Sequence, residues 1–373
     1  MYPQSIRLCA LFLMVPGIVA AEDTAETAPP VIKQVVAIEN VCAWPNLTLL
    51  DDGTIIAILF NQPSHGQMAG DVDCWASRDG LAWEKRGAVT GHDPNTVRMN
   101  HAAGLAANGD LVVLCSGWSN EKQAERPKQA DFRDAILRPW VLRSSNGGRS
   151  WEKREAFPAP EAGWSEYIPF GDIWAGKDGA LHAACYHGVF VDPTKSTRME
   201  RYRTWHFRSN DDGLTWKAVS LITPVSNETA LPIGEVDIFP GEGQKWLAVG
   251  RTARTILLRS DDNGMTWSEP QPVTGSGEIN AHLNRLEDGR LLLTYGVRTR
   301  GNQGVCAKLS GDGGNTWGDS IRLANSESSD CGYPSSVQLP NGSIVTAWYS
   351  RKTPERDRYQ MGATVWRAPP AEQ

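Results

Sequence analysis

Short runs of apolar and β-branched residues recur along the chain, and most of them follow a two-residue turn signal. Asp-Gly or Asn-Gly pairs stand just before the runs 55–60, 111–115, 291–295 and 344–349. These pairs favour the tight turn of a β-hairpin, because both residue types tolerate the backbone conformation that the turn requires. The pattern therefore predicts a succession of β-hairpins and an all-β fold.

A second repeat, about eight residues long, alternates with the hairpins. Three copies read Ser-x-Asp-x-Gly-x-Thr-Trp and two earlier copies are looser; the five begin at Ser77, Ser144, Ser209, Ser260 and Ser310. Asp and Gly favour a tight turn, the carboxylate accepts backbone N–H groups within that turn, and Trp packs beneath it. The repeat uses five of the 15 Trp residues of the chain. We interpret it as a folding device and assign it no chemistry.

The two repeats together define the predicted architecture. Six hairpins, five of them leading into the eight-residue repeat, imply six units of about 55 residues, each the size of a four-stranded blade. Residues 31–39 have strand character without a hairpin turn, and we expect them to complete the sixth blade so that no sheet edge is exposed. The predicted fold is an all-β, six-bladed β-propeller with four-stranded antiparallel blades over residues 31–368.

The N-terminal segment indicates export. Arg7 precedes an apolar run from Leu8 to Val19, which ends in the small residues Ala20 and Ala21. This order predicts a secretory signal peptide over residues 1–21, followed by a flexible, acidic leader over residues 22–30. We therefore expect a secreted or periplasmic protein, with no later segment apolar for long enough to span a membrane.

Composition excludes several functional classes. The formal net charge of −6 argues against a nucleic-acid partner, since such proteins usually present a basic surface. The cysteines have no zinc-site spacing, and we expect neither a metal nor a cofactor. Those beyond the predicted signal peptide lie in apolar runs and are expected to be buried free thiols: Cys42, Cys74, Cys115, Cys185, Cys306 and Cys331.

Polar residues are concentrated where the inner strands of the predicted propeller begin. These positions, and the ends of the second strands, should converge around the central channel at one face. Carboxylates, imidazoles and guanidiniums gathered in this way predict a ligand site, and indole rings suit stacking on sugars. The rim residues include Trp44, Asn46, His65, Asn100, His101, Trp118, Asp172, Glu235, Asp237, Arg251, Asn280, His282, Arg298, Asp330 and Tyr333.

Several of these residues occur in patterns that resemble the sialidase (neuraminidase) superfamily, whose turn repeat is called the Asp-box. Gly234-Glu235-Val-Asp-Ile, followed by Arg251 and the repeat at Ser260, is similar to the fourth blade of that family. Gly296-Val-Arg298 and Asp330-Cys-Gly-Tyr333-Pro-Ser are similar to later segments. The resemblance implies that Tyr333 is a nucleophile activated by Glu235, while Arg251 and Arg298 bind the carboxylate of the substrate.

Two positions depart from the family pattern. The family opens its first blade with Arg-Ile-Pro, whereas this chain has Cys42-Ala-Trp44-Pro. The acid/base Asp of the family begins the second blade, where this chain has Asn100-His101. We expect His101 or Asp172 to be the proton donor. The further substrate contacts that we expect are Asn100, His282, Trp44 and Trp118.

The leading hypothesis is a secreted exo-glycoside hydrolase that acts on a terminal acidic sugar, such as sialic acid, of a glycan. A polysaccharide lyase acting on uronic acids is a second possibility, with the arginines neutralising the carboxylate and Tyr333 or His101 exchanging the proton. A non-catalytic glycan-binding propeller is the third, because the first-blade arginine and the second-blade Asp are missing.

Overall fold

The computed structural model describes residues 31–65, 68–119, 135–161, 164–190, 199–223 and 232–371. The predicted signal peptide and leader lie outside these residues. The described part consists of β-strands joined by turns and loops, and it contains no helix. Accordingly, this part of the chain has no helix with the length and apolar character needed to cross a membrane.

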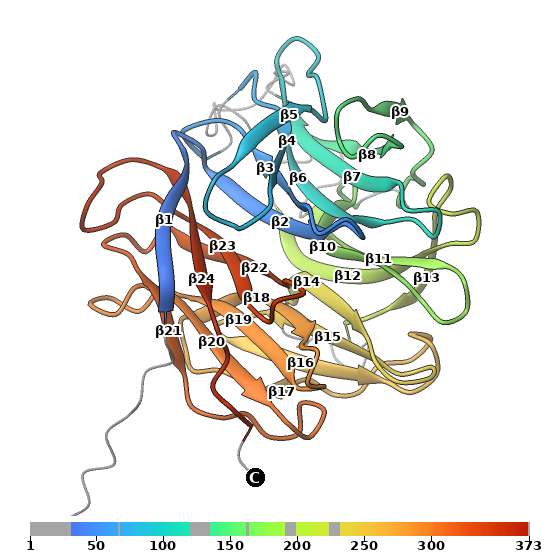
Figure 1. The fold of residues 1–373 in the computed structure, drawn as a ribbon. Helices are drawn as coiled ribbons and strands as arrows, with labels where there is room; N and C mark the ends of the chain where they lie inside the picture. Colours follow the sequence, from blue (N-terminus) through green and yellow to red (C-terminus); the bar gives the residue numbers. More distant parts are fainter. Residues whose placement is uncertain are drawn as a thin grey trace, which may run out of the picture.

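The described strands form four four-stranded sheets and one eight-stranded sheet. Figure 1 shows the sheets following one another around a common centre, so that the first and last parts of the chain meet. The four-stranded sheets contain β2 (Ala43–Leu49), β3 (Ile55–Phe60), β4 (Val72–Ser77) and β5 (Glu84–Ala88); β14 (Gly234–Pro240), β15 (Trp246–Arg251), β16 (Thr255–Ser260) and β17 (Gln271–Pro272); β18 (Glu278–Arg285), β19 (Leu291–Val297), β20 (Gly304–Ser310) and β21 (Ile321–Asn325); and β22 (Cys331–Gln338), β23 (Ile344–Ser350), β24 (Gln360–Trp366) and β1 (Val31–Glu39).

The last of these sheets is closed by the N-terminal strand. β1 pairs antiparallel with β24, with Gln34 opposite Thr364 and Val35 opposite Ala363. The prediction that residues 31–39 complete the final sheet is therefore confirmed. The pairing joins the two ends of the chain and covers an edge that would otherwise present unpaired backbone groups.

Two of the predicted blades are not separate sheets. The eight-stranded sheet contains β6 (Thr96–Leu105), β7 (Leu111–Ser119), β8 (Ala135–Ser144), β9 (Glu152–Arg154), β10 (Ile168–Ala175), β11 (Leu181–Phe190), β12 (Met199–Ser209) and β13 (Lys217–Leu221). It consists of two antiparallel halves joined by a short parallel pairing of β6 with β10, at Ala103–Asp172 and Gly104–Ile173. A Cβ atom on Gly104 would overlap the Ile173 carbonyl oxygen, so this close approach depends on glycine.

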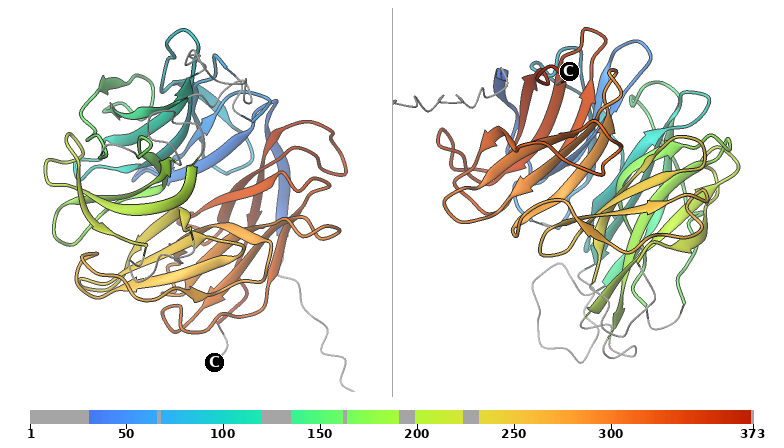
Figure 2. Two further views of the ribbon diagram at one scale, coloured as in Figure 1. Left: turned by 180° about the vertical axis from the view of Figure 1, so that it is seen from behind. Right: turned by 90° about the horizontal axis from the view of Figure 1, so that it is seen from below.

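The inner strands surround the centre of the molecule. β2, β6, β10, β14, β18 and β22 contact one another in that order, and β22 in turn contacts β2. The views in Figure 2 agree with this closed arrangement. Apolar side chains fill the spaces between successive sheets; one core cluster joins Leu59 and Phe60 of β3 to Tyr349 and Met361 of the last sheet. All six cysteines of the described residues are buried and unpaired, as predicted.

The Asp-boxes are compact turns held by their own side chains. In the third copy, Ser209 Oγ donates to Asp211 Oδ1 and accepts from Gly213 N–H, each at 2.8 Å. The indole N–H of Trp216 donates to the Gly213 carbonyl at 3.2 Å. The two serine contacts recur in all five copies. This geometry confirms the interpretation of the repeat as a folding device.

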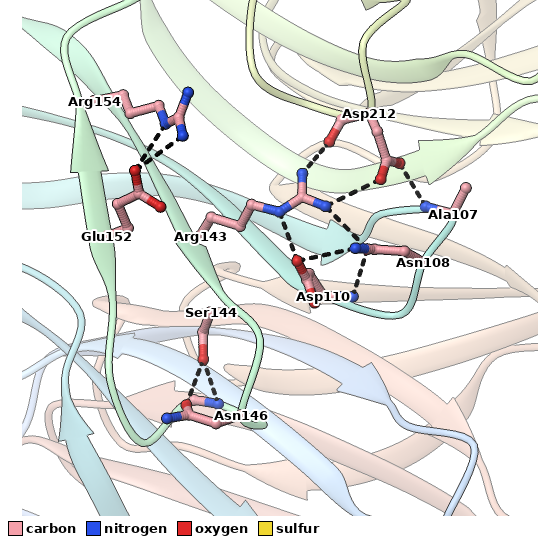
Figure 3. A network of polar contacts seen from close by, with 10 residues as sticks. Ala107, Asn108, Asp110, Arg143, Ser144, Asn146, Glu152, Arg154 and Asp212 are labelled. Carbon is pink, nitrogen blue, oxygen red and sulfur yellow. Dashed lines mark hydrogen bonds and ion pairs between the residues drawn. The ribbon is translucent and has the colours of Figure 1, made fainter.

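Each Asp-box also packs against the neighbouring unit of the ring, which is the preceding unit of the chain for four boxes and the last unit for the first box. The glycine of each box lies against a side chain of that unit, in the pairs Gly80–Val345, Gly148–Cys74, Gly213–Val112, Gly264–His206 and Gly314–Leu257. Arg143 makes a polar connection of the same kind, with Asp110 at 2.7 Å and Asp212 at 3.0 Å (Figure 3). The boxes therefore fasten successive units to one another around the ring.

We predict that Gly148→Ala destabilises the protein more than Gly289→Ala. The two glycines share a φ of +87°, but a Cβ at Gly148 would overlap Cys74 Sγ, whereas Gly289 has open space. Gly289→Ala is the control and should lower the free energy of unfolding by about 1–2 kcal/mol, because alanine disfavours this backbone conformation. Gly148→Ala should lower the free energy of unfolding by about 1–3 kcal/mol more, because the added methyl group overpacks the contact with Cys74; urea unfolding measures both losses. Equal losses in the two variants would show that the contact between units is unimportant.

We predict that Asp262→Asn flattens the loss of stability in acid. Hydrogen bonds from Thr266, together with those from Ser260 and Met265, lower the pKa of Asp262 to about 2. Its contribution is thus present above the unfolded value of 3.8 and is lost as the pH falls towards 2. Asn146 already occupies the equivalent place in the second box and accepts the same kind of turn hydrogen bonds. Thermal unfolding of both proteins between pH 2 and 6 tests this, and parallel curves would contradict it.

Candidate functional site

A β-bulge at the start of each inner strand determines where the site residues point. The register shifts in all six inner strands, for example between Gly234 and Asp237 in β14. In four of these strands a non-glycine residue within the bulge has positive φ: Trp44 (47°), Glu235 (50°), Asn280 (58°) and Tyr333 (45°). Such a backbone costs about 1–2 kcal/mol per residue and clusters at functional sites.

The centre of the site is a contact between Tyr333 and Glu235. The Tyr333 hydroxyl donates to Glu235 Oε1 at 2.5 Å. Arg251 Nη1 lies 2.7 Å from Glu235 Oε2 and donates to the Tyr333 oxygen at 3.2 Å. Asn280 Nδ2 donates to the same carboxylate oxygen as Arg251. Residues from three sheets thus meet at one carboxylate, which can accept the phenolic proton.

The electrostatics keep the phenol neutral in the resting protein. Burial and the adjacent Glu235 charge raise the pKa of Tyr333 well above its usual range, although Arg251 and Arg298 oppose this. Burial disfavours the charge of Arg251, but Glu235 and Tyr333 outweigh it and raise the pKa of Arg251. The guanidinium therefore stays cationic beside the hydroxyl and can stabilise negative charge that develops on the phenolic oxygen.

Arg298 lies over the ring of Tyr333, whereas Arg251 contacts its hydroxyl. The Arg298 Cζ lies 5.6 Å from the centre of the Tyr333 ring, and its Nε donates to the Cys331 carbonyl at 3.1 Å. Its Nη2 donates to the Tyr349 hydroxyl at 3.1 Å, and that hydroxyl donates to Asp330 Oδ1 at 2.5 Å. Arg251 and Arg298 are thus both brought to Tyr333, in positions that are fixed by neighbouring polar groups.

Aromatic rings form a wall around Tyr333. The rings of Trp44, Phe170 and Tyr349 have their centres 6.3, 5.8 and 5.6 Å from that of Tyr333. Trp44 stacks on Phe60 at 5.3 Å, which fixes the plane of the indole. The place where the resemblance leads one to expect a first-blade arginine is therefore apolar and aromatic.

Asn100 and Trp118 form a separate pair on the eight-stranded sheet. The Trp118 indole N–H donates to Asn100 Oδ1 at 3.0 Å. Trp118 packs at the edge of the core cluster that includes Trp44 and Tyr333. The pair thus lies beside the Tyr333 group, without a direct hydrogen bond to it among the described residues.

His101 lies in the interior, and its ring contacts two backbone carbonyls. Its Nδ1 faces the Met99 carbonyl at 2.9 Å and its Nε2 faces the Ile58 carbonyl at 3.1 Å. The side chain is buried, and burial lowers its pKa. Since both ring nitrogens are occupied by backbone oxygens, this environment favours a structural role; the proton-donor role of His101 stays a prediction.

Asp172 and His282 belong to a buried polar group within the channel. His282 Nε2 lies 3.1 Å from Asp172 Oδ2, and Asn46 Nδ2 donates to Asp172 Oδ1 at 2.6 Å. Asp237 accepts the backbone N–H groups of Asp172 and Leu283, each at 3.0 Å. Burial and the charge of Asp172 together raise the pKa of Asp237. This group connects four inner strands, which is a structural function in itself.

A cavity of about 530 Å³ lies at the hairpin end of this channel. It is lined mainly by the later residues of β2, β6, β10, β18 and β22, together with Asp172. The Tyr333 group lies at the opposite end of these strands, so we place the candidate active site at the bulges and not in this cavity. Among the described residues, no cluster of His, Cys, Asp and Glu is arranged to hold a metal ion.

Sequence reasoning gave no role to several residues that contact the site. Asn280, His65 and Asp330 were placed on the rim by the spacing alone, while Tyr349, Tyr359 and Phe170 were not singled out. Tyr359 donates to Asp330 Oδ2, and His65 Nδ1 lies 3.6 Å from the same oxygen. Tyr349 ends a buried strand and Tyr359 follows a loop, so neither stands at a bulge position from which its contact was predictable.

Comparison with known proteins identifies the family. A family model described as a BNR repeat-like domain matches residues 53–345. This match covers most of the chain, which therefore belongs to that family. The matched residues include the five Asp-boxes described above.

Similar proteins include sialidases. Anhydrosialidase from Macrobdella decora is 29% identical over 146 residues, which cover 35% of this chain and 18% of that protein. The chain thus matches less than a fifth of the length of this curated relative.

Among solved structures, a protein of unknown function from Dyadobacter fermentans has a TM-score of 0.77 at 20% identity, covering 92% of this chain and all of that one. A Trypanosoma rangeli sialidase in complex with 2,3-difluoro-KDN has a TM-score of 0.64 at 17% identity, covering 88% of this chain and 53% of that one. At such identities the likeness concerns the fold.

We predict that the stabilising effect of His282 is larger in acid than in base. Burial opposes its ionisation, but Asp172 outweighs this and raises the pKa of His282 above 6.5. The contribution is therefore fully present below the unfolded value and is lost as the pH rises through the folded value. The difference in melting temperature between wild type and His282→Gln should shrink from pH 5.5 to 9; a difference independent of pH would contradict the pairing with Asp172.

Proposed function

We propose that this protein is a glycoside hydrolase that removes a terminal acidic sugar from a glycan. The observation that carries the proposal is the hydrogen bond from the Tyr333 hydroxyl to Glu235, made beside the cation of Arg251. A nucleophile, a base within hydrogen-bond reach and a cation for the developing charge make up the essential parts of covalent catalysis.

A neutral phenol suits an anionic substrate. An attacking carboxylate would be repelled by the acid group of the sugar, whereas Tyr333 is uncharged until it reacts. As the phenolic oxygen approaches the anomeric carbon, its proton passes to Glu235 over the existing 2.5 Å contact. Arg251 remains within 3.2 Å of the oxygen and offsets its negative charge during the transfer.

The two arginines provide the binding site for the acid group. Among the contacts of the described residues, Arg251 uses Nη1 for Glu235 and Tyr333, and Arg298 uses Nε and Nη2 for Cys331 and Tyr349. Arg251 thus keeps Nε and Nη2, and Arg298 keeps Nη1, for a ligand. Two planar guanidinium groups next to the same tyrosine suit a carboxylate, which accepts hydrogen bonds at both oxygens.

The comparisons support this class of activity. The similar proteins include an anhydrosialidase and sialidases, and one Trypanosoma rangeli sialidase forms a covalent intermediate with 2,3-difluorosialic acid. Because the chain matches only part of the length of those proteins, the identity of the acidic sugar is left to experiment. Sialic acid is the first candidate, and uronic acids are the second.

We also infer a six-bladed propeller over residues 31–368, exported by a signal peptide. The support for six blades is the ring of six inner strands and the weak, two-pair junction between the halves of the eight-stranded sheet. The support for export is the apolar run at residues 8–19 and the small residues after it.

We predict that Tyr333→Phe abolishes the release of sugar from aryl glycosides of sialic and uronic acids, with a loss in kcat of several orders of magnitude. Tyr295→Phe is the matched control, because Tyr295 is buried in β19 and its hydroxyl contacts Ser320 at 2.8 Å. That variant should retain wild-type kcat. Release of the aryl group is followed by absorbance or fluorescence.

Three results would contradict the proposal in different ways. Turnover that survives Tyr333→Phe rules out this nucleophile. A product that absorbs in the ultraviolet because of a new double bond identifies a lyase. Saturable binding of acidic glycans without any turnover by the wild type identifies a glycan-binding protein.

A further inference from the structure

The proposed reaction also needs a proton donor for the departing oxygen. An alkoxide is a poor leaving group, and a positioned acid typically accelerates its departure by about 10²–10⁴-fold. Among the described residues, neither residue expected in this role from the sequence has a hydrogen bond to the Tyr333 hydroxyl. His101 is occupied by two backbone carbonyls, and Asp172 is held within the channel by Asn46 and His282.

His65 has the surroundings that this role requires. It lies in the loop between β3 and β4, and its side chain is 40% exposed. Its ring packs edge-on against Trp44, with centres 4.7 Å apart, and Trp44 in turn borders Tyr333. The imidazole therefore stands on the aromatic wall of the site and has access to solvent.

Asp330 lies beside this imidazole. His65 Nδ1 lies 3.6 Å from Asp330 Oδ2 and 3.9 Å from Cys42 Sγ. Nδ1 is therefore the ring nitrogen that faces the carboxylate. Nε2 has no hydrogen-bond partner among the described residues. Burial disfavours the charge of Asp330, but the adjacent His65 and the hydrogen bonds from Tyr349 and Tyr359 outweigh it and hold the pKa of Asp330 well below its usual range. An ionised carboxylate thus lies on the Nδ1 side of the ring, and Nε2 is the nitrogen left to exchange a proton with a ligand.

Asp330 also connects His65 to the substrate-binding arginine. Its Oδ1 accepts from Tyr349, whose oxygen accepts from Arg298. One carboxylate therefore positions both the imidazole and the guanidinium. This shared anchor places His65 on the same rim as the group expected to bind the substrate.

We propose that His65 is the catalytic acid and base of the reaction and that Asp330 is its positioning residue. This inference rests on the proposed hydrolase function. In the first step, Tyr333 forms a bond to the anomeric carbon and its proton passes to Glu235. The glycosidic bond breaks, and the departing oxygen takes the proton from His65 Nε2. In the second step, neutral His65 takes a proton from water as the water oxygen attacks the anomeric carbon. The bond to Tyr333 then breaks, and the phenolate recovers its proton from Glu235.

The test compares leaving groups of different acidity in the full-length protein. The substrates are 4-nitrophenyl and alkyl glycosides of the acidic sugar that the wild type hydrolyses. For His65→Ala, kcat/KM for the alkyl glycoside should fall by about 10²–10⁴-fold, whereas for the 4-nitrophenyl glycoside it should fall by less than about tenfold, because nitrophenolate leaves without a proton. The alkaline limb of the pH profile for the alkyl glycoside should disappear in the variant.

His92→Ala is the matched control, because His92 forms a second histidine–carboxylate pair, with Asp71 at 2.9 Å, outside the Tyr333 group. It should leave both substrates unaffected. Equal losses for the two leaving groups in His65→Ala, at an unchanged melting temperature, would assign His65 to substrate binding and overturn the proposal. Wild-type rates in His65→Ala would overturn it too, while leaving Tyr333 and Glu235 in place. An inactive wild type would instead refute the hydrolase function itself.

Discussion

The carboxylate of Glu235 accepts hydrogen bonds from Tyr333, Arg251 and Asn280, and these contacts hold the candidate active site together. The partners come from three different sheets, so the arrangement exists only when three successive sheets are packed together. A carboxylate taken out of water is costly unless it is paired and hydrogen-bonded, and here both oxygens have partners. The same contacts that satisfy this partly buried charge also direct the phenol towards its base.

The scaffold provides the rigidity that this geometry needs. Asp-boxes fasten neighbouring units to one another, and the pairing of β1 with β24 joins the two ends of the chain. Against this frame, the bulges hold Trp44, Glu235, Asn280 and Tyr333 in a backbone conformation that such residues rarely adopt. The cost of that conformation is borne by the stability of the surrounding sheets, which is why it persists at the site.

The fold was largely predictable from the sequence because its turns repeat. Asp-Gly pairs and Asp-boxes are local signals, and the strands follow from them. Asn280 and Tyr333 were recognisable as rim residues from their spacing to these turns. The fusion of β6 with β10 was not predictable, since it depends on the distance between two strands that are remote in sequence.

The contacts of the site were predictable only in part. Spacing brought Glu235, Arg251 and Tyr333 to the same face, but whether His101 or His65 faces the site depends on how each loop and bulge turns its side chain. Asp330 stands next to the bulge of β22, and its partners Tyr349, Tyr359 and His65 come from three other segments. Networks of this kind arise from tertiary packing, which no local pattern encodes.

The most direct test of the account is to identify the residue that becomes covalently attached to the sugar. The protein is treated with a 2,3-difluoro derivative of the acidic sugar, digested and mapped by mass spectrometry. The account predicts one glycosyl adduct, on the peptide and side chain of Tyr333, and its absence in the Glu235→Gln and Tyr333→Phe variants. An adduct on any other residue, in a protein that hydrolyses the parent sugar, would contradict it.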